Sequence, residues 1–468
     1  MKNGTAIIAG ALAQSVLCTE MSMHHTEPFD ATDLAQRSLR SVWHPCTQMK
    51  LHEAQPPIAI THAQGPWLHA AGGQRYLDGV SSWWVNLFGH SHPHIQAALI
   101  DQIGRLDHVM LAGFTHAPVV ELSERLGVLT GLGHAFYGSD GAAATEIALK
   151  MSAHYWRNTG RPEKCRFIGL ANGYHGETVG ALAVTDIAIF REAYAPLLRL
   201  ATTVPSPDAR TAAPGESASD VAEHCAKVLE VWLAEHHTQT AAFIVEPLVQ
   251  CAAGMAMYDP HYLRLVRALC DRYEVHLVVD EIATGFGRTG TMFAYQQAGI
   301  RPDFVCLSKG LTGGTLPLSA VLTTDTVYQA FYADEMVRGF LHSHSYTGNP
   351  LACRAALATL EIFEQQDVLA NNLLLAQTLD AALQPLTRHP RVRNARRLGM
   401  IWAWDVDTTL PHFARRYHHH AMQLGLLLRP IGTTIYAMPP YVLDAEAQAC
   451  LALGALAALN ATLQEETI

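Results

Sequence analysis

Short apolar runs alternate with amphipathic segments along most of this chain. Buried strands are expected where β-branched and other apolar residues run together, in segments that begin at residues 134, 166, 241, 275 and 304. Helices are expected where apolar residues recur every three or four positions, as in 118–130, 220–236 and the part of 134–156 that follows the turn at 139–141. In the helix expected at 92–106, one apolar face carries Ile95, Leu99, Ile103 and Leu106. Because strands and helices alternate, the pattern predicts an α/β fold with a mainly parallel sheet and right-handed crossovers.

Segments outside this alternation of strands and helices show other patterns. Residues 66–84 are typical of a strand, a glycine turn and a second strand, and 201–220 of a mobile surface loop. Strands in 393–406 and 426–440 and a helix near 411–424 predict a smaller α+β domain. We expect a leader at 1–28, the small domain at 29–85 and 351–468, and a large domain at 86–350.

Composition narrows the possible partners to small molecules. The chain has 468 residues, a net charge of −10 and no long basic run, which argues against nucleic acid and anionic membranes. The nine cysteines form no CxxC pair and fit reduced thiols in the cytoplasm. Residues 1–20 resemble a secretory signal but are too short to span a membrane, and we favour a disordered or misassigned leader over export, with Met21 or Met23 as an alternative start. No other stretch is expected to cross a membrane.

Two chemical groups stand at the ends of predicted strands. The run 275–280 stops at Asp280 and the run 304–309 stops at Lys309. In a parallel α/β sheet the carboxyl ends of the strands form the edge where ligands bind. An amine that attacks a carbonyl, facing a carboxylate that keeps a ring nitrogen protonated, is what pyridoxal phosphate chemistry needs.

The residues around this pair identify a family. DEIATGFGRTG (280–290) and SKGLTGGTLPLSA (308–320) resemble the fold-type I, class III pyridoxal phosphate aminotransferases. The resemblance implies that Asp280 binds the pyridine nitrogen and that Lys309 attaches pyridoxal 5′-phosphate covalently. It also makes 86–350 the cofactor-binding domain.

Further cofactor residues follow from the same resemblance. The turn before 141–156 offers helix N-terminal donors to a phosphate at Gly141 and Ala142, where the family usually has a hydroxyl residue at the second position. Tyr174 matches the aromatic residue that stacks on the cofactor ring. Ser345 matches a threonine that reaches the phosphate of the neighbouring subunit, which implies a homodimer with shared sites.

Narrower motifs resemble the branch of the class that serves biotin biosynthesis. They are WHPCTQM (43–49), DGVSSWW (78–84), HVMLAGFTHAP (108–118) and RPIGTTIYAMPPY (429–441). This branch transfers an amino group from S-adenosylmethionine to 8-amino-7-oxononanoate. For such a substrate we expect an apolar trough and a cation for the carboxylate. The residues implied are Trp83, Trp84, Gly314, Arg429 and Tyr436. Because adjacent residues at a strand end point opposite ways, at most one tryptophan needs to face the ligand.

Some positions leave alternatives open. Cys46 and Glu177 depart from the usual motifs, and Glu177 suits lysine as the amino donor because it could bind a distal ammonium. Another ω-aminotransferase remains an alternative, as does a non-catalytic cofactor sensor, although the latter needs a DNA-binding segment that the N-terminus lacks. His418, His419 and His420 are interpreted as surface residues, and no metal site is predicted.

Overall fold

The computed structural model describes residues 31–466. It separates into two compact units, of which the first ends at Ala59 and the second begins at Ile60. The described part of the first unit contains the helix α1 (Ala31–Ser41) and the 3₁₀ helix η1 (Met49–Glu53). The predicted leader at 1–28 lies outside the described residues.

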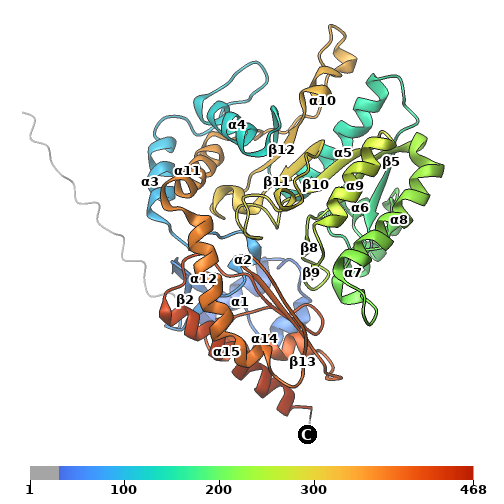
Figure 1. Ribbon diagram of the computed structural model, residues 1–468. Helices are drawn as coiled ribbons and strands as arrows, with labels where there is room; N and C mark the ends of the chain where they lie inside the picture. The colour runs from blue at the N-terminus through green and yellow to red at the C-terminus, as the bar shows by residue number, and fades with distance from the viewer. Residues whose placement is uncertain (1–30, 467–468) are drawn as a thin grey trace, which may run out of the picture. The chain divides into compact units, whose positions relative to one another are not determined.

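A mostly parallel sheet forms the centre of the second unit (Figure 1). Its strand order is β4-β12-β11-β10-β7-β5-β6. Only β12 runs against the others in this sheet, because its pairings with β4 and β11 are both antiparallel. The predicted α/β class with a mainly parallel sheet is confirmed. The strands are β4 (His134–Gly138), β5 (Arg166–Leu170), β6 (Thr202–Val204), β7 (Thr240–Val245), β10 (His276–Asp280), β11 (Phe304–Leu307) and β12 (Ser319–Thr323).

Helices cover both faces of this sheet, which explains why its central strands β7, β10, β11 and β12 are buried along their whole length. Val278 packs in one core cluster with residues of α5 (Gly141–Asn158), whereas Leu277 and Val279 pack in another with residues of α9 (His261–Arg272). Side chains that alternate along β10 therefore reach opposite cores, and both are dry. The other helices of this region are α3 (Pro93–Ile103), α4 (Ala117–Thr130), α6 (Val179–Val184), α7 (Ala188–Arg191), α8 (Ala218–His236), α10 (Asp325–Gln329) and α11 (Pro350–Gln366).

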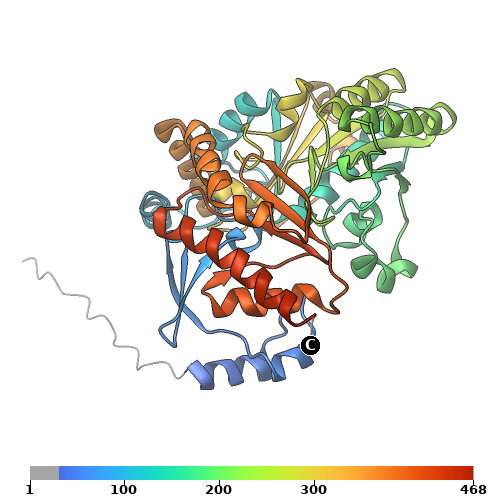
Figure 2. The same cartoon turned by 60° about the horizontal axis from the view of Figure 1, so that its bottom comes forward.

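The C-terminal residues form a three-stranded antiparallel sheet, β13-β14-β16, and complete a four-stranded sheet, β1-β2-β3-β15. Figure 2 brings the C-terminal helix α15 (Ala445–Gln464) to the front in red. The remaining elements are β1 (Ile60–Gln64), β2 (Trp67–Ala70), β3 (Arg75–Asp78), α2 (Ser81–Trp84), β8 (Val249–Gln250), β9 (Ala256–Met257), α12 (Val368–Ala382), α13 (Gln384–Thr387), β13 (Val392–Leu398), β14 (Ile401–Val406), α14 (Phe413–Gln423), β15 (Leu426–Leu427) and β16 (Thr434–Ala437).

The expectation that no other stretch is apolar enough to cross a membrane is wrong for helix α15. It is long and apolar enough, by length and composition alone, to cross a bilayer. However, it packs against α12, α13 and α14, and it buries Leu451 and Leu459 completely. We therefore assign it to the core of the C-terminal region.

Two other expectations about helices are wrong in part. Ile103 was expected on the buried face of its helix, but it lies at the end of α3 and is 62% exposed. Among the three adjacent histidines of α14, His418 is not a plain surface residue, because its Nδ1 donates to the Leu428 carbonyl over 2.7 Å. His420 contacts the Glu465 carboxylate at 2.6 Å.

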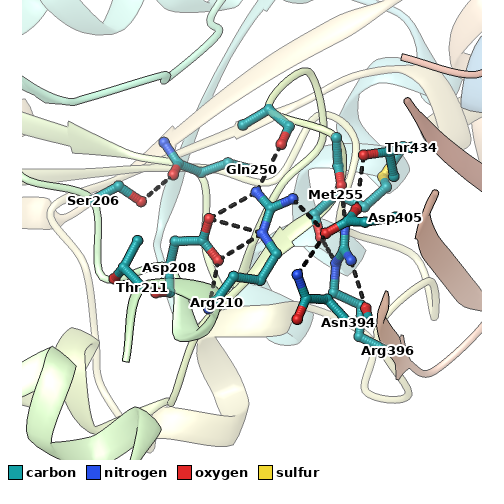
Figure 3. Close-up of polar contacts among 12 residues, drawn as sticks. Ser206, Asp208, Arg210, Thr211, Gln250, Met255, Asn394, Arg396, Asp405 and Thr434 are labelled. Carbon is teal, nitrogen blue, oxygen red and sulfur yellow. Dashed lines mark hydrogen bonds and ion pairs between the residues drawn. The ribbon is translucent and has the colours of Figure 1, made fainter. Parts of the chain in front are cut away.

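The segment 201–220 is more ordered than a mobile loop. It contributes β6 to the central sheet, and it carries Asp208 and Arg210 into a network of ion pairs. Figure 3 shows Arg210 between Asp208 and Asp405, with Arg396 on the other side of Asp405. Arg396 also donates to the carbonyls of Met255 and Gly254. The network therefore ties the β8–β9 hairpin to β13 and β14.

We predict that Arg396→Ala destabilises the fold by roughly 2 kcal/mol, because it removes one charged donor of the largely buried Asp405 carboxylate and the side-chain donor to two carbonyls. Urea unfolding measures the change. The matched control is Arg105→Ala, which breaks an exposed pair with Asp101 and is expected to cost less than about 1 kcal/mol. Equal effects of the two substitutions would contradict a structural role for the network.

Candidate active site

Two neighbouring parallel strands bring Asp280 and Lys309 to the same edge of the sheet. Asp280 is the last residue of β10 and pairs with Cys306 of β11. Lys309 begins the 3₁₀ turn two residues after β11 ends, with a left-handed φ of 46°. The carboxylate and the amine therefore lie at the carboxyl ends of adjacent strands, as the sequence predicts.

Two buried groups form hydrogen bonds with the Asp280 carboxylate. Its Oδ2 lies 2.7 Å from Nδ1 of His175, and its Oδ1 accepts a hydrogen bond from the Ile282 backbone N–H over 3.0 Å. Both side chains are at most 5% exposed. The second ring nitrogen of His175 is buried and has no hydrogen-bond partner among residues 31–466. This arrangement fixes the direction in which the carboxylate points.

The Lys309 ammonium lies 4.4 Å from the centre of the Trp84 ring. Its pKa is lowered from the ordinary lysine value, chiefly because burial penalises the charged form. Cys251, Asp280 and Glu246 act in the opposite direction but do not outweigh the loss of solvation. A larger fraction of neutral amine at a given pH makes this lysine a better nucleophile and base.

Glu246 is a second buried carboxylate at this edge, and sequence reasoning assigned it no role. Its Oε2 accepts from the Tyr174 backbone N–H over 2.9 Å, and its Oε1 from the Cys251 N–H over 3.1 Å. Burial raises the pKa of Glu246 to about 7. The sequence pattern that could have identified it resembles that of Asp280, because the apolar strand β7 is followed directly by this acidic residue.

The N-terminus of α5 is a ready anion site. The Asp140 side chain caps the helix by accepting from the Ala143 N–H, which leaves the backbone N–H groups of Gly141 and Ala142 without a partner in the described part of the chain. A Cβ at Gly141 would lie 2.9 Å from the side chain of Ile282. Because Ile282 follows Asp280 by two residues, these donors lie beside the Asp280 strand end. The arrangement fits a phosphorylated pyridine.

Tyr174 lies in the loop after β5, where Glu246 holds its backbone. Its ring packs edge-on to Phe190, with 5.6 Å between the ring centres. Its hydroxyl donates to the Glu177 carboxylate over 2.9 Å. Glu177, which the sequence suggested for a donor ammonium, is thus already hydrogen-bonded to a site residue.

The predicted substrate residues lie around the segment 83–86. The indole N–H of Trp84 donates to the Tyr436 hydroxyl over 3.2 Å. The guanidinium of Arg429 lies 5.6 Å from the centre of the Trp83 ring. Gly314 has a φ of 83°, and a Cβ there would lie 2.8 Å from backbone atoms of Asn86.

The local structure that presents the tryptophans differs from the prediction. Residues 81–84 were expected to end a strand, but they form the helical turn α2. Trp83 is 48% exposed and Trp84 is 6% exposed, so the two rings do point differently. The two rings point differently because they lie on a helical turn, and not because side chains alternate along a strand.

Ser345 is the predicted site residue that stands apart. It lies exposed in the loop before α11.

In residues 31–466 no group of three or more His, Cys, Asp and Glu side chains is placed to bind a metal.

Comparison with known proteins identifies the family. The model of aminotransferase class-III matches residues 49–458. A relative from Helicobacter pylori, named adenosylmethionine-8-amino-7-oxononanoate aminotransferase, is 46% identical over 88% of this chain and 94% of its own length.

Solved structures agree with this match. The enzyme of the same name from Methanocaldococcus jannaschii has a TM-score of 0.86 and 33% identity over 92% of this chain and 99% of that chain. An amine transaminase from an uncultivated Pseudomonas species, solved with bound pyridoxal phosphate, has a TM-score of 0.85 and 31% identity over 90% and 99% of the two chains. The chain therefore belongs to the class III aminotransferases, which are pyridoxal phosphate enzymes.

Proposed function

We propose that this enzyme transfers an amino group from S-adenosylmethionine to 8-amino-7-oxononanoate and so makes 7,8-diaminononanoate for biotin synthesis. The observation that carries the proposal is the pair of Lys309 and Asp280 at one strand edge, with Arg429 lying over Trp83 nearby. The names of the relatives from Helicobacter pylori and Methanocaldococcus jannaschii support this substrate pair.

Each cofactor residue has a distinct task in this proposal. The free N–H groups of Gly141 and Ala142 and the positive end of α5 bind the phosphate. The Asp280 carboxylate, held by His175, would accept a hydrogen bond from the protonated pyridine nitrogen, and Tyr174 would stack on the ring. Lys309 provides the amine that attaches the cofactor. When bound, pyridoxal phosphate supplies an electron sink for the substrate carbon that loses its proton.

With pyridoxal phosphate and substrate bound, Lys309 would also move protons. Its buried Nζ would take the proton from the carbon that bears the substrate amine, and the cofactor would supply the electron sink. Trp84 restricts water on one side of this nitrogen. Arg429 binds the carboxylate of the amino-keto acid with its planar fork, and Trp83, Trp84, Gly314 and Tyr436 border the aliphatic chain.

The proposal includes a homodimer in the cytoplasm. Met336, Leu341 and Tyr346 are 79%, 73% and 62% exposed and lie in the same segment as Ser345. Exposed apolar side chains of this kind favour a protein interface. In the dimer, Ser345 of one subunit reaches the phosphate site of the other. The free thiols of the described cysteines from Cys165 to Cys450 suit a reducing compartment.

The lowered pKa of Lys309 predicts that its amine becomes reactive at lower pH than an ordinary lysine. Competitive acetylation of the cofactor-free protein, followed by mass spectrometry across pH, measures the titration of this one amine. The same peptide in urea-denatured protein is the control. We expect the folded midpoint to lie below the denatured one, and coincident midpoints would contradict the desolvated environment.

Arg429→Ala is expected to raise KM for the amino-keto acid at least about tenfold, because a carboxylate loses its charge-assisted partner. KM for the donor should change much less. In Arg429→Lys, KM for the amino-keto acid should lie between the values of wild type and Arg429→Ala. Arg415→Ala, at an exposed position of α14, is the matched control. A similar loss in both half-reactions would indicate a structural role for Arg429.

The experiment that tests the function follows each half-reaction alone. Holoenzyme is mixed with S-adenosylmethionine, or with lysine, in the absence of acceptor, and the visible absorbance of the bound cofactor is recorded. We expect S-adenosylmethionine to bleach it, and Lys309→Ala to give no response. The Tyr174 hydroxyl already hydrogen-bonds to Glu177, the residue that favours lysine. Bleaching by lysine alone would overturn the proposed donor.

A further inference from the structure

Residues Ser81–Trp84 form one turn of a left-handed helix. Their φ values are 51°, 46°, 74° and 70°. The Trp84 N–H donates to the Val80 carbonyl over 2.9 Å, and the Val85 N–H donates to the Ser81 carbonyl over 3.0 Å. None of the four is glycine, so each Cβ is crowded against the following carbonyl oxygen. Such a run persists only where the surrounding structure imposes it.

The Asp78 carboxylate hydrogen-bonds to this turn. Its side chain is completely buried at the end of β3. Its Oδ1 accepts from the Ser82 backbone N–H over 2.8 Å, and its Oδ2 accepts from the Ser82 hydroxyl over 2.6 Å. His90 Nε2 lies 3.0 Å from the same Oδ2. The carboxylate therefore binds the first half of the turn through both the backbone and the side chain of one residue.

The hand of the turn decides where the two tryptophans point. Successive side chains on a helical turn are rotated by about 100°, and a reversed hand would rotate them the other way. In the left-handed turn Trp83 faces the Arg429 guanidinium, and Trp84 lies against the Lys309 ammonium and donates to Tyr436. One turn thus positions both the tryptophan beside Arg429, which is proposed to bind the substrate carboxylate, and the tryptophan beside Lys309.

Asp78 is also in register with the strand that carries Arg429. β3 pairs in parallel with β15, and Asp78 stands opposite Leu427. The Gly79 N–H donates to the Leu427 carbonyl over 3.1 Å, two residues before Arg429. On the far side, the Ser81 hydroxyl donates to the Met438 carbonyl over 2.8 Å. The turn and the arginine are therefore built on paired segments.

We propose that Asp78, acting through Ser82, is a positioning residue for the acceptor substrate. It holds the left-handed turn that sets Trp83 against Arg429 and Trp84 against Lys309. The inference rests on the proposed function in so far as Arg429 and Trp83 bind the acceptor carboxylate. It goes beyond that function by assigning a role to a buried carboxylate that, in the described part of the chain, hydrogen-bonds to none of the proposed substrate residues.

A matched pair at the exposed Ser82 tests the turn without disturbing the core. Ser82→Gly and Ser82→Val both lose the hydroxyl, but glycine adopts a left-handed φ readily and a β-branched residue does not. We expect Ser82→Val to raise KM for the amino-keto acid about tenfold or more, with a smaller change in kcat. Ser82→Gly should stay within about threefold of wild type. Equal KM values for the two variants would overturn the proposal.

The role of Asp78 itself is tested by Asp78→Ala and by the double variant Asp78→Ala/Ser82→Gly. We expect the single variant to raise KM at least tenfold and the added glycine to recover most of that loss, because the turn then needs less support. Failure of the glycine to recover KM in a folded single variant would contradict positioning through the turn. Should Asp78→Ala not fold, the Ser82 pair decides the question.

Amide hydrogen exchange at residues 82–86, measured on holoenzyme without substrate, separates this inference from the proposed function. Ser82→Val and Asp78→Ala should both exchange at least tenfold faster there than wild type, while the β10 amides stay unchanged. Unchanged exchange at 82–86 would overturn the inference even if the wild type makes 7,8-diaminononanoate. If the wild type does not act on that keto acid, the proposed function fails, and the exchange rates still decide whether Asp78 holds the turn.

Discussion

Parallel pairing of β10 with β11 is the constraint on which the candidate active site depends. It brings the end of one strand, Asp280, beside the start of the turn after the other, Lys309. Both strands are buried on two faces, so a one-residue shift in register would exchange the side chains that pack in the two cores and disrupt the packing of both. The hydrophobic cores thereby fix the distance between an amine and a carboxylate that no direct contact holds together.

Burial also sets the chemistry of these groups. Desolvation lowers the pKa of Lys309 and raises the pKa of Glu246 to about 7, which moves both toward their neutral forms. For Glu246 the native state binds a proton that the unfolded state has released, so its contribution to stability is present at low pH and is lost as pH rises from about 4.5 to about 7. Asp280 instead has the partner His175 beside it. The site thus combines an amine whose pKa is lowered by burial with a carboxylate supported by hydrogen bonds.

The sequence predicted those parts of the site that depend on strand ends. Asp280 and Lys309 follow apolar runs, and the strand C-termini of a parallel sheet share one edge, so their proximity could be inferred. The hand of the turn at Ser81–Trp84 could not be inferred, because no glycine marks its positive φ values and the burial of Asp78 arises only in the folded structure. Ile103 was misplaced for a similar reason, since the helix ends there and the periodic pattern does not reveal which face the neighbours cover. The predicted domain limits and the roles of the site residues remain predictions.

The central claim is that Asp280 keeps the pyridine nitrogen of the cofactor protonated. The ¹⁵N chemical shift of that nitrogen, in holoenzyme loaded with ¹⁵N-labelled pyridoxal phosphate, reports its protonation directly. We predict a protonated nitrogen in the wild type and an unprotonated one in Asp280→Asn, which preserves the shape of the side chain and removes its charge. The same shift in both proteins would contradict the account.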